Sequence, residues 1–491
     1  MQLKKSIFAL LLVLAIIIGG VGTYFALELI PIFGQEQQTG EQNQSLSDNE
    51  YENMLNDLTD AISLPKVVQA YSIIQSNYIE PIDNQDLVEG AIRGMLTILN
   101  DPYSEYMDLE TMEQFNEQIG SSFEGIGAEV SMIGDRVTIV APIKGSPAEK
   151  AGLRPNDQVF TVDGESVEGL DLYEAVALIR GEKGSEVVIG IQRPGVPDLI
   201  EFTLVRDTIP LETVYAEMLE TDGNKAGVIQ ITSFAEQTAN RFQEELISLE
   251  SQGMDGLVID VRGNPGGLLD VTEDILKLFI PSDLPYMQIA DNEDNKTRFF
   301  SDLAEAKDYP VSVLIDEGSA SASEILAIAL NETIDAEIVG HTSFGKGTVQ
   351  QTVPLGDGST LKLTILKWLS PEGRSIHEVG VEPTIEVSQP EYYYTAPIQV
   401  EETLKLDETN VNIGYAQVML EALGYPVDRE DGYFSEQTAQ AIRDYQTDRE
   451  LTVTGELDQE TANTIVAEVI ERIRNDEDDL QKNQAIKALF N

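Results

Sequence analysis

The stretch from Val311 to Leu330 most constrains how this chain can fold. Its first five residues are mostly apolar and β-branched, which predicts a buried strand, and Glu324 to Leu330 predicts an apolar helix. A strand that turns directly into a helix places small side chains at the helix N-terminus, where free N–H groups and the helix dipole favour developing negative charge. A nucleophilic serine benefits from both effects. A Ser-x-x-Glu capping box formed by Ser321 and Glu324 is the alternative interpretation.

A candidate base for such a serine lies downstream, in a glycine-rich segment. Lysine can accept a serine proton if burial or a cationic neighbour lowers its pKa enough to make the amine neutral. Lys346 stands between two glycines, which allow close approach to another backbone, and Gln350 could orient the amine by hydrogen bonding. A surface lysine in a glycine turn is the alternative. His341 and His377 also leave a serine–histidine–aspartate triad open, which only the fold can exclude.

A third glycine turn, Asn264-Pro-Gly-Gly267, also stands between a predicted strand and a predicted helix. The backbone N–H groups of Gly266 and Gly267 can face an anion, as an oxyanion hole requires. Ala322, directly after the candidate serine, could supply one more donor.

These three segments, in this order, closely resemble the C-terminal processing proteases, also called tail-specific proteases. The matching residues are Asn264–Gly267, Gly318–Glu324 and Phe344–Gln350. The resemblance implies that Ser321, and not Ser319 or Ser323, is the nucleophile, that Lys346 is the general base and that Gln350 positions it. Nothing else in the sequence separates the three serines.

The amino-acid composition excludes several classes of binding partner and cofactor. The chain of 491 residues has 86 acidic and 31 basic residues, a formal net charge of −55, which argues against nucleic acid and anionic lipid surfaces as partners. Substrates are expected to be neutral or basic. The chain has no cysteine, so thiol catalysis and cysteine-bound zinc are excluded. We expect no cofactor and no metal.

The N-terminal residues 1–30 predict a membrane anchor. Lys4 and Lys5 precede an uncharged run from Ser6 to Leu27, long enough to span roughly 30 Å of hydrocarbon as a helix. Positive flanking charge stays cytoplasmic, so the chain after it is expected outside the cell as part of a single-pass protein. A cleaved signal peptide, which would give a secreted protein, is the alternative. Residues 31–60 predict a polar linker.

Two domains are expected before the protease core. Residues 61–119 show apolar positions at helical spacing, which predicts a small helical domain with its own core. Related proteases use an equivalent segment to dimerise, so the resemblance implies a homodimer. Residues 120–205 resemble a PDZ domain, through motifs that include Gly125–Ala128, Gly145–Ala148 and Ala151–Asp157. That resemblance implies that backbone N–H groups near Ile126, Gly127 and Ala128 bind the terminal carboxylate of a protein tail.

Arg180 ends the predicted PDZ helix, Leu172 to Arg180, just before Gly181. Its guanidinium could reach a carboxylate or backbone carbonyls across a domain boundary, so we predict that it helps tail binding to gate the active site. An arginine that only offsets the helix dipole is the alternative.

The remaining chain predicts four further parts. An α/β core is expected at 206–388, a linker at 389–409, a compact helical module at 410–470 and an acidic tail at 471–491. The charged end of that tail, from Asn475 onward, is expected to be a frayed, solvated helix. The module resembles a peptidoglycan-binding domain through Leu420–Tyr425, Asp431–Phe434 and Val453–Gly455, among other positions.

The fold class expected is therefore multidomain α/β, with an anchor helix, a helical domain, a PDZ domain, a Ser-Lys protease core and a wall-binding module. The expected function is cleavage of extracytoplasmic proteins recognised by their C-termini. The alternative is a catalytically silent scaffold that bridges protein tails and cell wall.

Overall fold

The computed structural model describes residues 64–490, apart from 121, 134–135, 171, 194–195, 197–198, 401 and 476–477. The predicted anchor at 1–30 and nearly all of the polar segment that follows it lie outside this range. Among the described helices, none is both long and apolar enough to cross a membrane. The chain divides into two compact units. Of the described residues, the first unit comprises those up to Gln118 with Ala290–Asn295 and Thr348–Lys367, and the second comprises the rest.

The first unit contains helices followed by short strands. Its elements are α3 (Leu64–Asn77), α4 (Asn84–Thr97), β1 (Glu105–Met107), most of α5 (Leu109–Ile119), β17 (Thr348–Pro354) and most of β18 (Thr360–Leu369). Asp83 begins α4 by accepting a hydrogen bond from the Gln85 N–H at 2.7 Å. β18 pairs antiparallel with both β1 and β17.

The apolar side chains of α3 and α4 are largely exposed. Among the residues of α3 and α4 whose burial is described, none is buried. Val68 is 56% exposed, Ile74 41% and Met95 65%. The apolar positions of α3 and α4 therefore lie on faces that the described residues leave exposed. The helical domain at 61–119, in which Tyr106 and Met107 are buried, stays a prediction.

The PDZ segment is a small sheet with two helices. Its elements are β3 (Ala128–Ile133), β4 (Arg136–Pro142), α6 (Pro147–Ala151), β5 (Gln158–Val162), β6 (Glu165–Ser166), α7 (Leu172–Ile179), β7 (Glu186–Gln192) and β8 (Ile200–Val205). The strand order β3-β4-β5-β7-β8 leaves β3 at an edge. The chain enters and leaves this domain through a ribbon of two antiparallel strands, β2 (Ser122–Gly125) and β9 (Asp207–Pro210).

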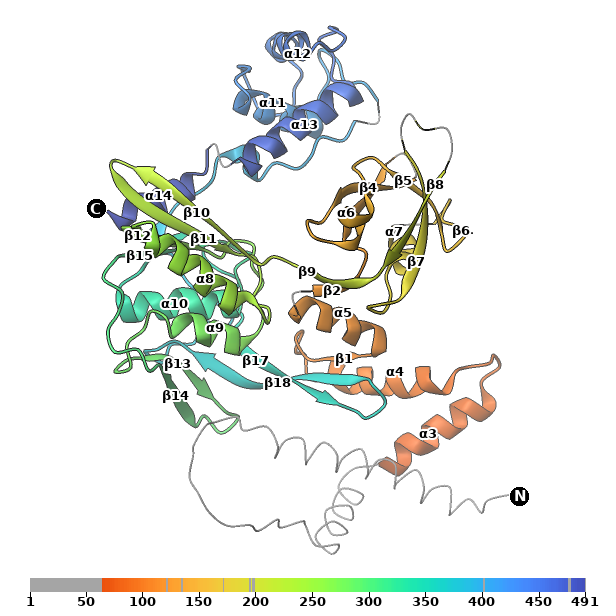
Figure 1. Ribbon diagram of the computed structural model, residues 1–491, viewed down its shortest axis with the longest axis vertical. Coiled ribbons are helices and arrows are strands. Elements are labelled where there is room, and N and C mark those ends of the chain that lie inside the picture. The colour runs from red at the N-terminus through yellow and green to blue at the C-terminus, as the bar shows by residue number, and fades with distance from the viewer. Residues whose placement is uncertain are drawn as a thin grey trace, which may run out of the picture. The chain divides into compact units, whose positions relative to one another are not determined.

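The protease core is built on one six-stranded sheet, with order β10-β11-β12-β15-β16-β19. Figure 1 labels β10, β11, β12 and β15 of this sheet. The strands are β10 (Val214–Thr221), β11 (Asn224–Ile231), β12 (Gly256–Asp260), β15 (Val311–Ile315), β16 (Glu337–Gly340) and β19 (Ile385–Glu386). Only the β10–β11 pair is antiparallel within this sheet. The helices are α8 (Thr238–Ser251), α9 (Leu269–Leu276) and α10 (Ala322–Ile334), and β13 (Pro285–Ala290) and β14 (Lys296–Phe300) follow α9. Every residue of β12 and β15 is buried, as expected of parallel strands covered on both faces.

The C-terminal end contradicts the predicted acidic, solvated tail at 471–491. Helix α13 (Gln459–Arg474) occupies the start of that range, and α14 (Leu480–Leu489) packs against β12, β15 and β16. Ala485, Ile486 and Leu489 are buried against the sheet residues Ala226, Val228, Val258, Leu314 and Val339. The acidic run ends at Asp479, and the apolar residues beyond it cover a sheet face that would otherwise be exposed.

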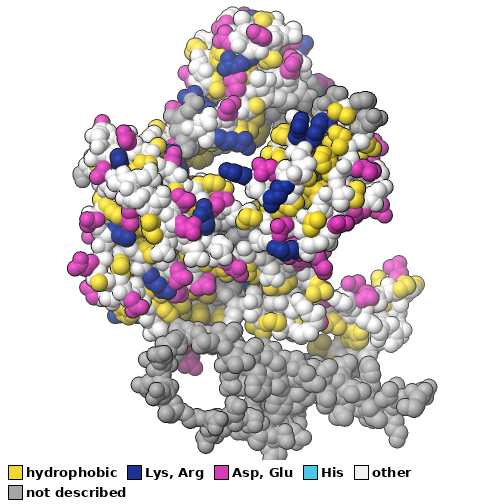
Figure 2. All heavy atoms as spheres, viewed as in Figure 1, with side chains coloured by type: hydrophobic (Ala, Val, Ile, Leu, Met, Phe, Trp, Pro, Cys, Tyr) yellow, Lys and Arg dark blue, Asp and Glu magenta, His cyan; other side chains and the backbone are white. Residues whose placement is uncertain are grey.

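The C-terminal module precedes α14. Helices α11 (Val411–Ala422), α12 (Glu436–Asp448) and α13 enclose a core in which Ile413, Phe434, Ile442 and Tyr445 are fully buried. A short helix η1 (Glu391–Tyr393) contributes Tyr392 to the same core. Figure 2 shows acidic side chains scattered over the visible face with lysine and arginine among them, in keeping with the net charge of −55.

Candidate active site

The backbone at the end of β15 distinguishes Ser321 from its neighbours. Ser321 has φ 55° and ψ −110°, outside the regions that a residue with a Cβ normally occupies. Such a conformation costs on the order of 1–3 kcal/mol and persists only when its surroundings enforce it. A strained serine between a strand and a helix is the arrangement that exposes a nucleophile at the edge of an α/β sheet.

The two flanking serines have structural contacts. Ser319 and Ser323 are fully buried. The Ser319 hydroxyl donates to the Val261 carbonyl at 2.8 Å, and the Ser323 hydroxyl donates to the Asn264 carbonyl at 2.9 Å. Ser321 is half-buried. The structure therefore separates three serines that the sequence pattern leaves equivalent.

The buried carboxylate of Glu324 joins the serine turn to the lysine loop. Its Oε2 accepts from the backbone N–H of Ser321 at 2.7 Å and from that of Lys346 at 2.8 Å. Its Oε1 accepts from the Gly345 N–H at 2.6 Å and from the Ser343 hydroxyl at 2.5 Å. Since one oxygen serves both Ser321 and Lys346, their nitrogens can be no further apart than these two bonds placed end to end.

The role of Glu324 goes beyond the capping box that the sequence suggested. Its carboxylate does bind the Ser321 N–H, as a capping glutamate would. Three further donors come from residues 343–346, which are distant in sequence. The Ser-x-x-Glu spacing was the available signal, but only the fold shows what the second oxygen binds.

The lysine loop has two further attachments. The Phe344 N–H donates to the Ser319 carbonyl at 3.0 Å. The indole N–H of the buried Trp368 donates to the Lys346 carbonyl at 2.9 Å. Glu324 binds the Lys346 N–H and Trp368 binds the Lys346 carbonyl, so the backbone of this residue is fixed. Its side chain is half-buried and therefore partly desolvated.

The glycine turn after β12 lies against the serine turn. A Cβ added to Gly266 would stand 2.9 Å from Ser321 Cβ and 3.0 Å from the Ala322 nitrogen, so only glycine fits there. The Ala320 N–H donates to the Asn264 carbonyl at 3.0 Å. The Gly266 N–H donates to Asn264 Oδ1 at 2.8 Å and is therefore already engaged, which argues against its predicted use as an oxyanion donor.

Gln350, His341 and His377 contact residues other than Ser321 and Lys346. In the first unit, the Gln350 amide nitrogen lies 3.0 Å from the Thr348 hydroxyl and 3.1 Å from that of Thr364. In the second unit, His341 Nδ1 lies 3.8 Å from Glu317, and His377 Nδ1 accepts from the Gly347 N–H at 3.4 Å. These histidine contacts give no support to a serine–histidine–aspartate triad.

The predicted peptide-binding loop of the PDZ domain comes directly before the edge strand β3. Ile126 is buried, and its carbonyl accepts from the Ala148 N–H at 2.8 Å. Gly127 has φ 74°, and a Cβ there would stand 2.4 Å from Ser146 Cβ. Ala128 begins β3. The Ile126 carbonyl thus binds the loop to α6, and the absence of a side chain at Gly127 allows the loop to approach Ser146 closely.

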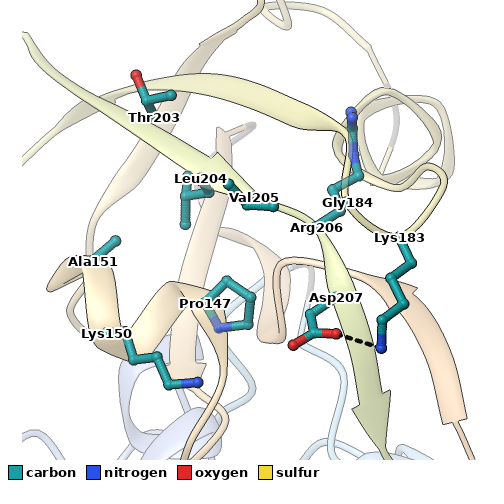
Figure 3. Close-up of a pocket in the computed structure, with 10 residues that line it drawn as sticks. All are labelled: Pro147, Lys150, Ala151, Lys183, Gly184, Thr203, Leu204, Val205, Arg206 and Asp207. Atoms are coloured by element: carbon teal, nitrogen blue, oxygen red, sulfur yellow. Dashed lines mark ion pairs between the residues drawn. The ribbon is translucent and has the colours of Figure 1, made fainter.

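The loop after α7 attaches the PDZ domain to the β2–β9 ribbon. The Arg180 guanidinium lies 5.1 Å from the centre of the Phe123 ring in β2. The Lys183 N–H donates to Glu124 at 2.9 Å, and its amine pairs with Asp207 of β9 at 2.8 Å. Figure 3 shows this ion pair beside a groove of about 540 Å³ between α6 and β8. Arg180 and Lys183 therefore contact the ribbon from a loop that continues the PDZ helix.

Comparison with known protein families identifies the class of protein to which this fold and this serine turn belong. Residues 225–387 match peptidase family S41, residues 138–193 a PDZ domain and residues 409–465 a peptidoglycan binding domain. Residues 16–111 match the N-terminal domain of the activating protease CtpB. The chain belongs to peptidase family S41.

Within that family, the similarity extends to whole proteins. The chain is 46% identical to the carboxy-terminal processing protease CtpB of Bacillus subtilis over 99% of this chain and 100% of that one. It is 38% identical to CtpA of the same organism over 100% and 99%. It is also 36% identical to a probable CtpA-like serine protease of Staphylococcus aureus over 86% and 85%. The protein is thus a serine protease of the carboxy-terminal processing type.

Replacing Glu324 by glutamine tests how far the site depends on this carboxylate. Glutamine keeps the volume but places an amide NH₂ where two acceptor oxygens now meet four donors. We expect Glu324→Gln to lower kcat about 100-fold, since small misplacements of reacting groups cost about that much. Glu332→Gln, which changes a carboxylate on the same helix that pairs with Arg374, is the control and should keep most of the activity. Equal activity of the two variants would contradict the role given to Glu324.

Proposed function

We propose that this protein is a Ser-Lys endopeptidase, anchored in the membrane, that cleaves extracytoplasmic proteins whose C-termini its PDZ domain has bound. The shared hydrogen-bond acceptor Glu324 Oε2 carries the proposal, because it draws together the backbones of Ser321 and Lys346. The strained backbone at Ser321 supports it further.

The reaction proceeds through an ester on Ser321. Its hydroxyl oxygen attacks the peptide carbonyl carbon while the neutral Lys346 amine takes the proton. The N–H groups of Gly267 and Ala322 bind the oxyanion, Ala322 being the first residue of α10, where N–H groups have no partner within the helix. The leaving amine takes the proton back from Lys346. Water then attacks the ester carbonyl while Lys346 again takes a proton. The Ser321 oxygen leaves and takes that proton back from Lys346, which restores the serine and releases a new carboxylate. Gln350 is proposed to orient the lysine.

The catalytic assignment predicts two inactive variants. Ser321→Ala removes the nucleophile with little change in volume, and Lys346→Arg leaves a guanidinium that stays protonated and cannot accept a proton. Both should lose at least about 1000-fold in hydrolysis of an unstructured protein, an estimate that follows from the loss of a unit of the catalytic machinery. His341→Ala should remain active.

The same measurement separates the alternatives. Activity of Lys346→Arg with loss in His341→Ala would replace the dyad by a histidine triad. An inactive wild-type ectodomain that still binds tails and cell wall would favour the catalytically silent scaffold.

The PDZ domain is proposed to bind protein tails by strand addition. β3 is an edge strand, so its outer backbone groups can pair with an extended peptide. The N–H groups of Ile126, Gly127 and Ala128 at its start would receive the terminal carboxylate. Arg180 and Lys183, which follow the helix of the same domain, contact the ribbon that leads to the core.

Gating by tail binding can be tested at Arg180. A tail peptide activates the enzyme only if the active state binds it more tightly. We expect an apolar tail peptide to accelerate hydrolysis of a separate reporter peptide several-fold in wild type and in the control Arg154→Ala, but not in Arg180→Ala. Arg154 is an exposed arginine of the same domain. Equal acceleration of all three proteins would reduce Arg180 to a helix cap.

The C-terminal module is proposed to bind peptidoglycan. A cleft of about 390 Å³ between η1 and α11 is lined by Tyr394, Tyr415 and the carboxylates of Glu391, Glu430 and Asp431. Tyr394 is 58% exposed and offers an aromatic surface. The combination suits a polymer that carries sugar faces and amino groups.

Wall binding is best tested by a point change in this cleft. Deletion of everything after Val411 would also remove α14 from the core sheet. We expect Tyr394→Ala to reduce cosedimentation of the ectodomain with purified sacculi, whereas Ile470→Ala, on an exposed part of α13 outside the cleft, should not. Unchanged binding of Tyr394→Ala would exclude this cleft.

Self-association and membrane anchoring complete the proposal. The uncovered apolar faces of α3 and α4 fit a homodimer interface, since soluble chains rarely leave such faces exposed. A monomeric wild-type ectodomain in sedimentation velocity would exclude that dimer. The segment Ser6–Leu27 supports anchoring, and recovery of the full-length protein in the soluble fraction of lysed cells would exclude it.

A further inference from the structure

The protease core is completed by residues from the end of the chain. The predicted core ends near Val387, yet α14 covers β12, β15 and β16 about a hundred residues later. Gln481 donates to the Val387 carbonyl at 2.8 Å, and Ser312 of β15 donates to the Ala485 carbonyl at 3.2 Å. The C-terminal module is therefore an insertion between two segments of the core.

Arg262, just before the glycine turn, binds Asp479 at the N-terminal end of α14. This arginine follows β12 and stands directly before Gly263. Its guanidinium binds Asp260 at 2.9 and 2.6 Å and Asp479 at 3.0 and 2.8 Å. It also donates to Gln481 at 3.0 Å. Asp479 in turn caps α14 by accepting from the Lys482 N–H at 2.8 Å.

This ion-pair cluster is mostly shielded from water. The side chain of Asp479 is 3% exposed and that of Arg262 is 17% exposed. Burial by itself would raise the pKa of Asp479, but the hydrogen bond and charge of Arg262 bring it below the usual value. Two bidentate contacts fix the plane of the guanidinium. Without the Asp479 carboxylate, Arg262 would keep its pair with Asp260 but lose the contacts that orient it toward α14.

The glycine turn is attached on its other side to the serine turn. The Gly263 N–H donates to Asp316 at 2.7 Å, and the Asn264 carbonyl accepts from Ser323 and from the Ala320 N–H. Gly266 and Gly267 come next in the chain, with φ 102° and 150°. The glycine turn is thus attached on one side to the segment that begins α10 and on the other side to the Arg262–Asp479 pair.

We propose that Asp479, acting through Arg262, is a positioning residue that holds the glycine turn where the Gly267 N–H can bind the oxyanion. The inference rests on the Ser-Lys function proposed above and adds a C-terminal residue to the support of the site. Asp479 does not contact the reacting atoms, so its effect is expected on the chemical step and not on substrate binding.

The test is the kinetics of Asp479→Asn in the full ectodomain. Asparagine keeps the shape but removes the charge and one acceptor oxygen, which frees the guanidinium to shift. We expect kcat to fall about 10- to 100-fold with KM nearly unchanged, in line with the cost of a small displacement of catalytic groups. Asp479→Glu should recover part of the loss because it restores the charge.

Two controls separate positioning from general damage. Asp478→Asn changes the adjacent carboxylate, which binds Arg472 and Tyr392 instead, and should keep wild-type kcat. Ile486→Ala removes buried volume from α14 without changing the ion pairs, and should lower the melting temperature while keeping kcat well below that temperature.

Each outcome has a distinct meaning. Wild-type kcat in Asp479→Asn would overturn the inference while leaving the Ser-Lys function intact. An equal loss of kcat in Ile486→Ala would also overturn it, since docking of α14 would then matter and not the ion pair. An inactive wild type would refute the proposed function itself.

Discussion

A buried carboxylate with four hydrogen-bond donors organises the catalytic half of this protein. Without Glu324, the strained serine turn and the lysine loop would have only weaker backbone contacts to hold them together. A carboxylate suits this position because each of its oxygens can accept two bonds, whereas an amide offers one acceptor atom. The cost of desolvating the charge is offset by donors fixed in two turns, so the same interaction that stabilises the charge also limits the distance between the serine turn and the lysine loop. The relative position of these two segments therefore depends on one side chain.

Much of the core could be predicted from the sequence because its signals are local. The strand at Val311–Ile315 has the predicted bounds, and α10 begins at Ala322, two residues before the predicted helix start at Glu324. The PDZ helix predicted at Leu172 to Arg180 also agrees with α7, Leu172–Ile179. Runs of β-branched residues and glycines next to helices report directly on nearby backbone. The three serines show the limit of such signals. Ser319, Ser321 and Ser323 differ only in what lies around them, and their partners Val261 and Asn264 come from a distant turn.

The features that the sequence did not show have the same origin. An apolar helical face in sequence does not say whether its own domain covers it, and α3 and α4 leave theirs uncovered. Conversely, the acidic run before Asp479 hides a helix that belongs to the core, because the sheet face that it covers is encoded more than a hundred residues earlier. Arg262 likewise looks like an ordinary turn residue until its partner Asp479 is seen.

The two-stranded ribbon at the PDZ domain has a consequence for how such proteins can vary. The chain enters the PDZ domain through β2 and leaves it through β9, and these two strands pair with each other. The whole domain is therefore inserted at the end of a two-stranded antiparallel ribbon. Ribbon register, from Ser122 opposite Pro210 to Gly125 opposite Asp207, is then the main geometric condition that a replacement domain must satisfy. A different binding domain with closely spaced ends could be spliced at this point without altering the strand order of the protease. The ligand of the inserted domain and the chemistry of the protease core can therefore change independently over evolutionary time.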